Sequence, residues 1–114
     1  MDKTIKDETI KDSFIDPRNK SITLYEKTWS RHILTNHVNI KNHYNELRET
    51  IENPDKIVEG RNPPTEELYI KTFPHMDMAV ATRDMTTNLT IVTTAYSDIP
   101  NKNWSSKGNT KWKK

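Results

Sequence analysis

The sequence predicts an α+β domain in which a short N-terminal strand and two helices precede a twisted antiparallel β-meander, with the helices packed on one face of the sheet. Apolar residues recur at helical spacing between residues 28 and 51, and the pattern changes to alternation after Pro54. Short turn-forming segments separate the alternating stretches, so consecutive strands are expected to pair antiparallel. With 114 residues, the chain has the length of one domain with one modest core.

The predicted first strand covers residues 21–25, which alternate polar and apolar side chains after a turn at residues 16–19. Thr28 can then cap a helix that presents Trp29 and Ile33 on one face, and residues 38–39 form a break before a second helix. The second helix has one apolar stripe and ends before Pro54, which disfavours helix in the preceding residue. The stripe consists of Ile40, Tyr44, Leu47 and Ile51.

Four strands are predicted after the second helix. A brief strand at residues 56–59 leads into a loop rich in Pro and Gly, and three longer strands rich in β-branched and aromatic residues follow. The connections at residues 74–75 and 84–88 are short enough for hairpins. The three longer strands cover residues 68–73, 78–83 and 89–96.

The ends of the chain differ in charge from the part between them. Residues 1–20 form a leader with five acids and five bases and are expected to be partly disordered, whereas residues 21–99 form the domain. Residues 100–114 form a basic tail with five lysines and no acid. Trp104 and Lys107 in this tail are candidate nucleic-acid ligands, because lysines attract phosphates and tryptophans stack on bases. The alternative is a solvated terminus with one tryptophan packed back on the domain.

The composition excludes several classes of function. The chain has no cysteine, which removes disulfides, thiolate catalysis and sulfur-ligated metal sites. Only two glycines occur, so a Gly-rich phosphate-binding loop is not expected. No apolar run approaches the roughly 20 residues that span a bilayer, and the charged N-terminus is unlike a signal peptide. The expectation is a soluble cytoplasmic protein without membrane contact.

Two of the four histidines lie close together in the segment Trp29-x-x-His32-Ile33-x-x-x-His37. Histidine has an unperturbed pKa of about 6.5 and can serve as an acid or a base. On a continuous α-helix, however, the two side chains point about 140° apart, so they do not face one phosphate together. His32 is therefore the first candidate acid or base, and its alternative is a half-buried histidine that satisfies backbone groups. His37 is either a second catalytic group or a cap on the helix end.

The histidine spacing gives no reason to expect a metal or another cofactor. Residues five apart do not share a helix face, unlike the four-residue spacing of zinc-binding histidine pairs. His43 and His75 are interpreted as surface residues in a helix and a hairpin turn.

The alternation of side chains along the predicted strands suggests which polar residues could bind a ligand. Lys71 and Arg83 fall on the same phase of neighbouring strands, where they would supply positive charge to a phosphate. Thr94 and Tyr96 are the favoured solvent-facing pair of the last strand and would supply hydroxyl groups. The alternative for each of these residues is ordinary surface decoration of a sheet.

The order of four short blocks resembles the phage-associated nuclease domains grouped with barnase, EndoU, colicin-type and RelE-type ribonucleases. The resemblance covers residues 22 to about 97 and rests on order and spacing. One departure is Val38-Asn39, where members of this group often have Pro-Glu. The blocks are Trp29-x-x-His32-Ile33-x-x-x-His37, Ile51-Glu52-Asn53-Pro54-Asp55-Lys56-Ile57, Tyr69-Ile70-Lys71 and Ile91-Val92-Thr93-Thr94-Ala95-Tyr96.

The resemblance implies a metal-independent endoribonuclease, toxin-like or phage-associated, in which the 2′-OH of RNA attacks the adjacent phosphorus. Such chemistry needs a base, an acid and donors or cations for the phosphate. By their positions in the matching blocks, the resemblance assigns catalysis to His32, His37, Thr94 and Tyr96 and substrate binding to Lys71. The alternation of side chains along the strands adds Arg83 as a substrate-binding residue, and the basic tail adds Trp104 and Lys107.

RNA is the expected partner, together with an inhibitor or a host protein. The alternative function is a catalytically inactive, nuclease-like protein that binds RNA or a host protein. Convergence of His32, Lys71, Thr94 and Tyr96 on one concave face would favour the enzyme, and their scatter would favour the binding protein.

Overall fold

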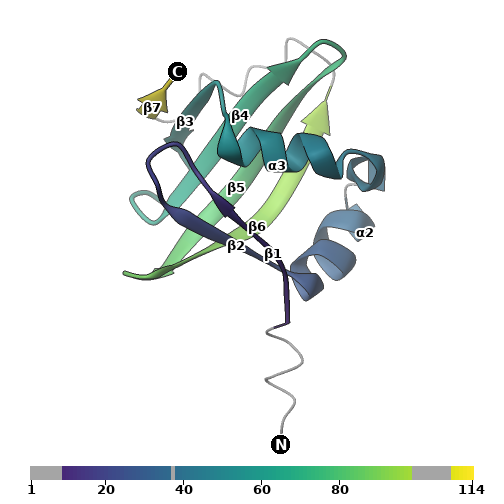
Figure 1. The fold of residues 1–114 in the computed structure, drawn as a ribbon, viewed down its shortest axis with the longest axis horizontal. Helices are drawn as coiled ribbons and strands as arrows, with labels where there is room; N and C mark the ends of the chain where they lie inside the picture. The colour runs from purple at the N-terminus through teal and green to yellow at the C-terminus, as the bar shows by residue number, and fades with distance from the viewer. Residues whose placement is uncertain (1–8, 37, 99–108) are drawn as a thin grey trace, which may run out of the picture.

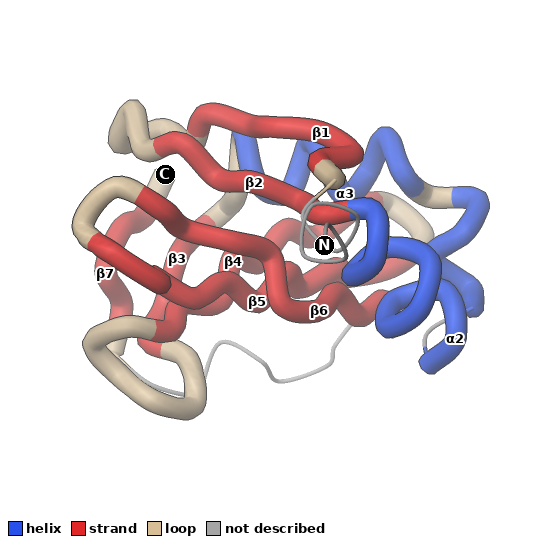
Figure 2. The backbone as a smooth tube through the Cα atoms, turned by 90° about the horizontal axis from the view of Figure 1, so that it is seen from below, coloured by secondary structure: helices blue, strands red, loops and turns tan. Residues whose placement is uncertain are grey.

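The computed structural model describes residues 9–36, 38–98 and 109–114, which form an α+β fold around one seven-stranded sheet. The strand order is β1-β2-β6-β5-β4-β3-β7, and every neighbouring pair is antiparallel except β2 and β6. The helices and the β1–β2 hairpin lie over the same face of the remaining strands (Figures 1 and 2). The predicted α+β class is confirmed, and the sheet is antiparallel as expected except at the β2–β6 pair. None of the helices that the described residues form is long and apolar enough to cross a membrane.

The centre of the sheet is the meander of β4, β5 and β6, preceded by β3. Its three strands occupy the positions that alternation predicts but extend by several residues, because the hairpins continue the pairing almost to their turns. The bounds are Lys56–Glu59 for β3, Glu66–Phe73 for β4, Met76–Thr86 for β5 and Leu89–Asp98 for β6.

Two strands lie outside the segment 21–99 that the sequence assigns to the domain. β1, Ile10–Ile15, pairs with β2, Ser21–Tyr25, so the second half of the charged leader forms a hairpin with the predicted first strand. The side chain of Phe14 is buried in the main core. The chain turns at Asn19, which adopts a positive φ of 69°, a conformation that asparagine tolerates better than most residues.

β7, Thr110–Lys113, closes the other edge of the sheet by pairing with β3. Trp112 from this strand is partly buried and packs against the main core. The last residues of the basic tail therefore belong to the sheet.

The helical part is less regular than the sequence predicts. Thr28–Ile33 forms a π-helix, η1, in which the Leu34 N–H donates to the Trp29 carbonyl, five residues back. The short α2, Leu34–Asn36, and the 3-10 helix η2, Val38–Asn42, follow. The expected second helix, from Ile40 to Ile51, is divided between η2 and α3, Tyr44–Glu52. The expectation of α-helical geometry is therefore wrong at residues 28–33, whereas Leu34–Asn36 is α-helical.

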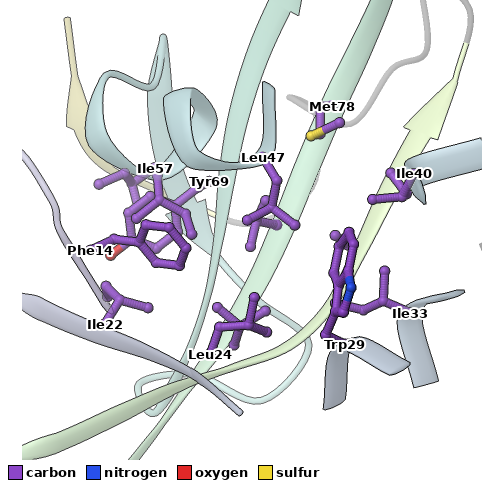
Figure 3. Close-up of a cluster of buried hydrophobic side chains, with 14 of the residues drawn as sticks. Phe14, Ile22, Leu24, Trp29, Ile33, Ile40, Leu47, Ile57, Tyr69 and Met78 are labelled. Carbon is purple, nitrogen blue, oxygen red and sulfur yellow. The ribbon is translucent and has the colours of Figure 1, made fainter. Parts of the chain in front are cut away.

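The main core lies between the sheet and the elements that cover it (Figure 3). Trp29, Ile33 and Leu47 from the helices are buried there, although their segments have different helical types. From the meander, Tyr69, Met78, Val80 and Val92 point into this core. A smaller cluster on the opposite face contains Val58, Ile70 and Ala79, with Leu68 and Tyr96 packed against it.

Candidate functional site

A β-bulge at Thr93 decides which way the polar residues of β6 point. Thr94 pairs with Ala81 whereas Val92 pairs with Thr82, so Thr93 is an extra residue in β6 and its hydroxyl donates to the Ala81 carbonyl at 3.3 Å. The bulge reverses the alternation, and Val92 and Ala95 both face the main core although they are three residues apart. Strict alternation would place Val92 on the same side of β6 as Thr94 and Tyr96, but the bulge puts Val92 on the face opposite to these two residues. A bulge cannot be predicted from alternation alone.

Thr94 and Tyr96 lie on the face opposite the helices. They pair with Ala81 and Ala79, and Ala79 belongs to the smaller cluster on that face. Both side chains are partly buried. The Thr94 Oγ1 atom is buried and has no hydrogen-bond partner among the described residues, and the same holds for Asp77 Oδ1 in β5. Buried polar atoms of this kind are uncommon and often mark functional positions.

His32 is exposed on η1, while Trp29 and Ile33 of the same helix are buried in the core. η1 follows β2 in the chain and packs against β6. The paired residues of β2 and β6 end at Thr23 and Ile91, so the rest of β6 pairs with β5 alone among the described strands.

Arg31, beside His32, is also exposed and forms no ion pair with a described residue. His37, Trp104 and Lys107 lie outside the described residues.

Lys71 and Arg83 do not share a face. The turn between β4 and β5 has two residues and pairs Phe73 with Met76, so odd-numbered residues of β4 lie opposite even-numbered residues of β5. Lys71 consequently lies opposite Met78, on the helix-covered face, and Arg83 lies opposite Glu66 on the other. The expectation of a joint phosphate site is wrong, because the sequence argument joined the strands in the wrong register.

Each of these two cations is also bound within the protein. Lys71 Nζ donates to the Asn53 carbonyl at 2.7 Å, just beyond α3, and lies 3.8 Å from Asp55 Oδ1. Arg83 binds Glu66 through Nε at 2.9 Å and Nη2 at 2.8 Å. The Arg83 hydrogen bond, together with the Asn62 side chain, lowers the pKa of Glu66 below its usual value. These contacts assign local structural roles to both side chains.

A network of buried and partly buried polar groups that the sequence does not indicate joins the β1–β2 turn to the sheet. Arg18 Nη2 donates to Asp16 Oδ2 at 2.8 Å and to Glu67 Oε1 at 2.7 Å. Lys20 Nζ extends the network to Asp84 at 2.9 Å. Burial alone would raise the pKa of Asp16, but hydrogen bonds from Tyr69, the Lys20 backbone and Arg18 outweigh it and hold the pKa below its usual value. Because its charges are paired with one another, the network has a structural role.

A second network ties the leader strand to α3. The Tyr44 hydroxyl donates to Asp12 Oδ2 at 2.7 Å, and the Arg48 guanidinium donates to the same oxygen. Burial and the hydrogen bond to Asp12 raise the pKa of Tyr44 well above its usual value. The Lys11 ammonium lies 5.3 Å from the centre of the Trp29 ring and 5.0 Å from that of Tyr44. Trp29 is thus surrounded by structural partners.

One group among the described residues could hold a metal ion. It consists of His43 and Glu46 at the start of α3 and His75 in the β4–β5 turn, whose ligand atoms all lie within 4.8 Å of one another. The His43-x-x-Glu46 spacing places two ligands on one helix face and was visible in the sequence. His75 could not be connected with them, because 29 to 32 residues separate it from the pair and only the packing of α3 on the sheet brings them together.

None of the known protein families, curated proteins or solved structures compared with this chain matches it. The fold and the two groups of residues, at β6 with η1 and at α3 with the β4–β5 turn, are therefore the basis for a functional proposal.

Proposed function

We propose that this protein is a metal-independent endoribonuclease, toxin-like or phage-associated, that acts in the cytoplasm. The observation that carries the proposal is that η1, which presents His32, packs against β6, the strand that also holds Thr94 and Tyr96. The η1 helix covers the core face of β6, and the side chains of Thr94 and Tyr96 point to its other face. These three residues come from two blocks of the resemblance to ribonucleases. The π-helical geometry of η1 adds support, because π-type turns inside helices are frequent at functional sites.

His32 is the acid or base of the proposed reaction. It would take the proton from the 2′-OH or give one to the leaving 5′-oxygen, and its exposure leaves it accessible to RNA. Thr94 Oγ1 and the Tyr96 hydroxyl are the proposed donors to the phosphate, and the lack of a partner for Thr94 Oγ1 is consistent with a role towards a ligand.

The cation for the phosphate requires a different assignment from the one the sequence suggested. Lys71 is left out of the proposed site because its Nζ atom donates to the Asn53 carbonyl and lies near Asp55. Arg31 replaces it, since it is exposed, adjacent to His32 and forms no ion pair with a described residue.

The test is incubation of the purified protein with total RNA in EDTA. We expect cleavage that leaves 2′,3′-cyclic phosphate ends in the wild type. In His32→Ala we expect a loss of roughly 10²- to 10⁴-fold, the usual contribution of general acid–base catalysis. Thr94→Val should also lose activity, whereas Thr87→Val, at an exposed position in the β5–β6 turn, should not. Equal cleavage by the wild type and His32→Ala would refute the assignment of His32.

A second candidate is a catalytically inactive protein that binds RNA or a host protein. It is favoured by the scatter of the four residues, since η1 with His32 and the residue Lys71 are on the helix-covered face of the sheet, whereas Thr94 and Tyr96 are on the other face. An inhibitor that restrains a ribonuclease would also bind this protein, so protein binding alone does not separate the two candidates. RNA that is bound but recovered intact, with the same affinity for wild type and His32→Ala, would support the binding protein over the enzyme.

A further inference from the structure

The start of α3 and the β4–β5 turn bring together three side chains that are common metal ligands. His43 precedes α3, Glu46 lies in its first turn, and His75 is exposed in the two-residue turn between Phe73 and Met76. The His43 and His75 rings have centroids 5.8 Å apart and are tilted by 40°. His43 Nδ1 lies 3.5 Å from Glu46 Oε1.

The distances are close to those of a metal centre. One potential ligand atom from each residue lies within 4.8 Å of the other two. In a tetrahedral zinc site with metal–ligand distances of about 2.0–2.1 Å, neighbouring ligand atoms are about 3.3 Å apart. The His43–Glu46 pair already has nearly this separation. His75 is exposed in a turn, so rotation of its side chain can bring it to the same distance.

The His43 Nδ1 atom forms no hydrogen bond with a described residue that would account for its position. His43 precedes α3, but its side chain makes no capping hydrogen bond. Its Nδ1 atom is buried and lacks a hydrogen-bond partner among the described residues, since the 3.5 Å contact with Glu46 does not have hydrogen-bond geometry. A buried nitrogen without a partner has lost its hydration and gains nothing in return, unless a ligand provides the missing interaction.

We propose that His43, Glu46 and His75 bind one divalent transition-metal ion of the zinc class. Two imidazoles and one carboxylate suit zinc, and three protein ligands leave the fourth position to water. The start of a helix carries a partial positive charge that disfavours a cation, and the negative charge of Glu46 offsets it. The ion would join α3 to the β4–β5 turn. The site shares no residue with the proposed ribonuclease site and does not depend on that proposal.

The experiment is a zinc titration of the full chain after removal of metals with EDTA and dialysis. Calorimetry should show one ion per protein, and zinc should raise the melting temperature because it binds the folded state. Glu46→Gln and His75→Ala should each weaken binding at least about tenfold, since even supporting groups of metal sites have effects of this size. His32→Ala is the matched control, because it removes an exposed histidine outside the group and should bind zinc like the wild type.

Cobalt gives a second readout that does not depend on stability. Co²⁺ bound in place of zinc should produce the intense visible absorption of a four-coordinate ion, and His75→Ala should abolish it. No binding of zinc by the wild type would overturn the proposal. An equal loss of affinity in His32→Ala and His75→Ala would also overturn it, because it would indicate general binding to surface histidines.

Discussion

The Tyr69 hydroxyl donates a 2.7 Å hydrogen bond to Asp16 Oδ2 and so links two residues that lie 53 positions apart in the chain. Tyr69 belongs to β4 in the middle of the sheet, and Asp16 lies in the turn that connects β1 and β2. Both side chains are almost fully buried. This bond anchors the β1–β2 hairpin over the meander, where the polar network around Arg18 holds it.

Tyr69→Phe removes this bond without leaving a large cavity. A hydrogen bond to a buried charged group contributes about 1.5–3 kcal/mol, so we expect the free energy of unfolding to fall by that amount. Urea denaturation followed by circular dichroism measures the change. Tyr25→Phe is the matched control, because the Tyr25 side chain is only half-buried and its hydroxyl makes no hydrogen bond with a described residue. Equal stability of Tyr69→Phe and the wild type would contradict the role of the bond.

The lowered pKa of Asp16 predicts a loss of stability in acid. Its pKa in the folded protein is below the ordinary 3.8, so the ionised carboxylate stabilises the fold above that pH. This contribution is lost as the pH falls through the folded-state pKa. Asp12 and Asp84, whose pKa values are also lowered by their hydrogen-bond partners against the effect of burial, act in the same direction.

The measurement is the free energy of unfolding between pH 7 and pH 2. Asp16→Asn should be less stable than the wild type at pH 7, and its stability should fall less steeply below about pH 4, because it lacks one titrating group. The control is Glu26→Gln, which removes a carboxyl group at an exposed position. Parallel curves for Asp16→Asn and the wild type would argue against the linkage.

Phe14→Ala tests whether the leader strand is an integral part of the domain. Phe14 is 1% exposed and packs in the main core, so its removal should cost about 3–5 kcal/mol of unfolding free energy. Its neighbour Ile15 is 51% exposed, and Ile15→Ala should change the stability by less than about 0.5 kcal/mol. Similar small effects of the two substitutions would mean that β1 contributes little to the fold. Urea denaturation at pH 7 gives both values.

Lys71→Met separates a structural role of Lys71 from a role in substrate binding. Lys71 donates to the Asn53 carbonyl beyond the end of α3, where a cation stabilises a helix by about 0.3–1 kcal/mol. We expect a loss of stability in this range and an unchanged affinity for RNA. Arg31→Ala should show the reverse, with weaker binding and unchanged stability. Fluorescence anisotropy with labelled RNA in EDTA measures the affinity, and a marked loss in Lys71→Met would restore that residue to the binding site.

The local patterns of the sequence predicted some elements well and others poorly for identifiable reasons. Alternation located the meander, because strands with one buried face repeat every two residues. It could not indicate β1, whose side chains are mostly exposed or half-buried apart from Phe14, or the four-residue β7. It also failed at Thr93, because one extra residue in β6 reverses the faces of all residues that follow.

By itself the sequence determined the α+β class, the strands of the meander, the apolar residues of the helices and the absence of cysteine chemistry. These properties depend on local periodicity and composition. Only the tertiary structure decided that Lys71 and Arg83 lie on opposite faces, that Asp16 meets Tyr69, and that His43 and Glu46 meet His75. The reason is that strand register and helix docking set distances between residues far apart in the chain, and no local pattern records them.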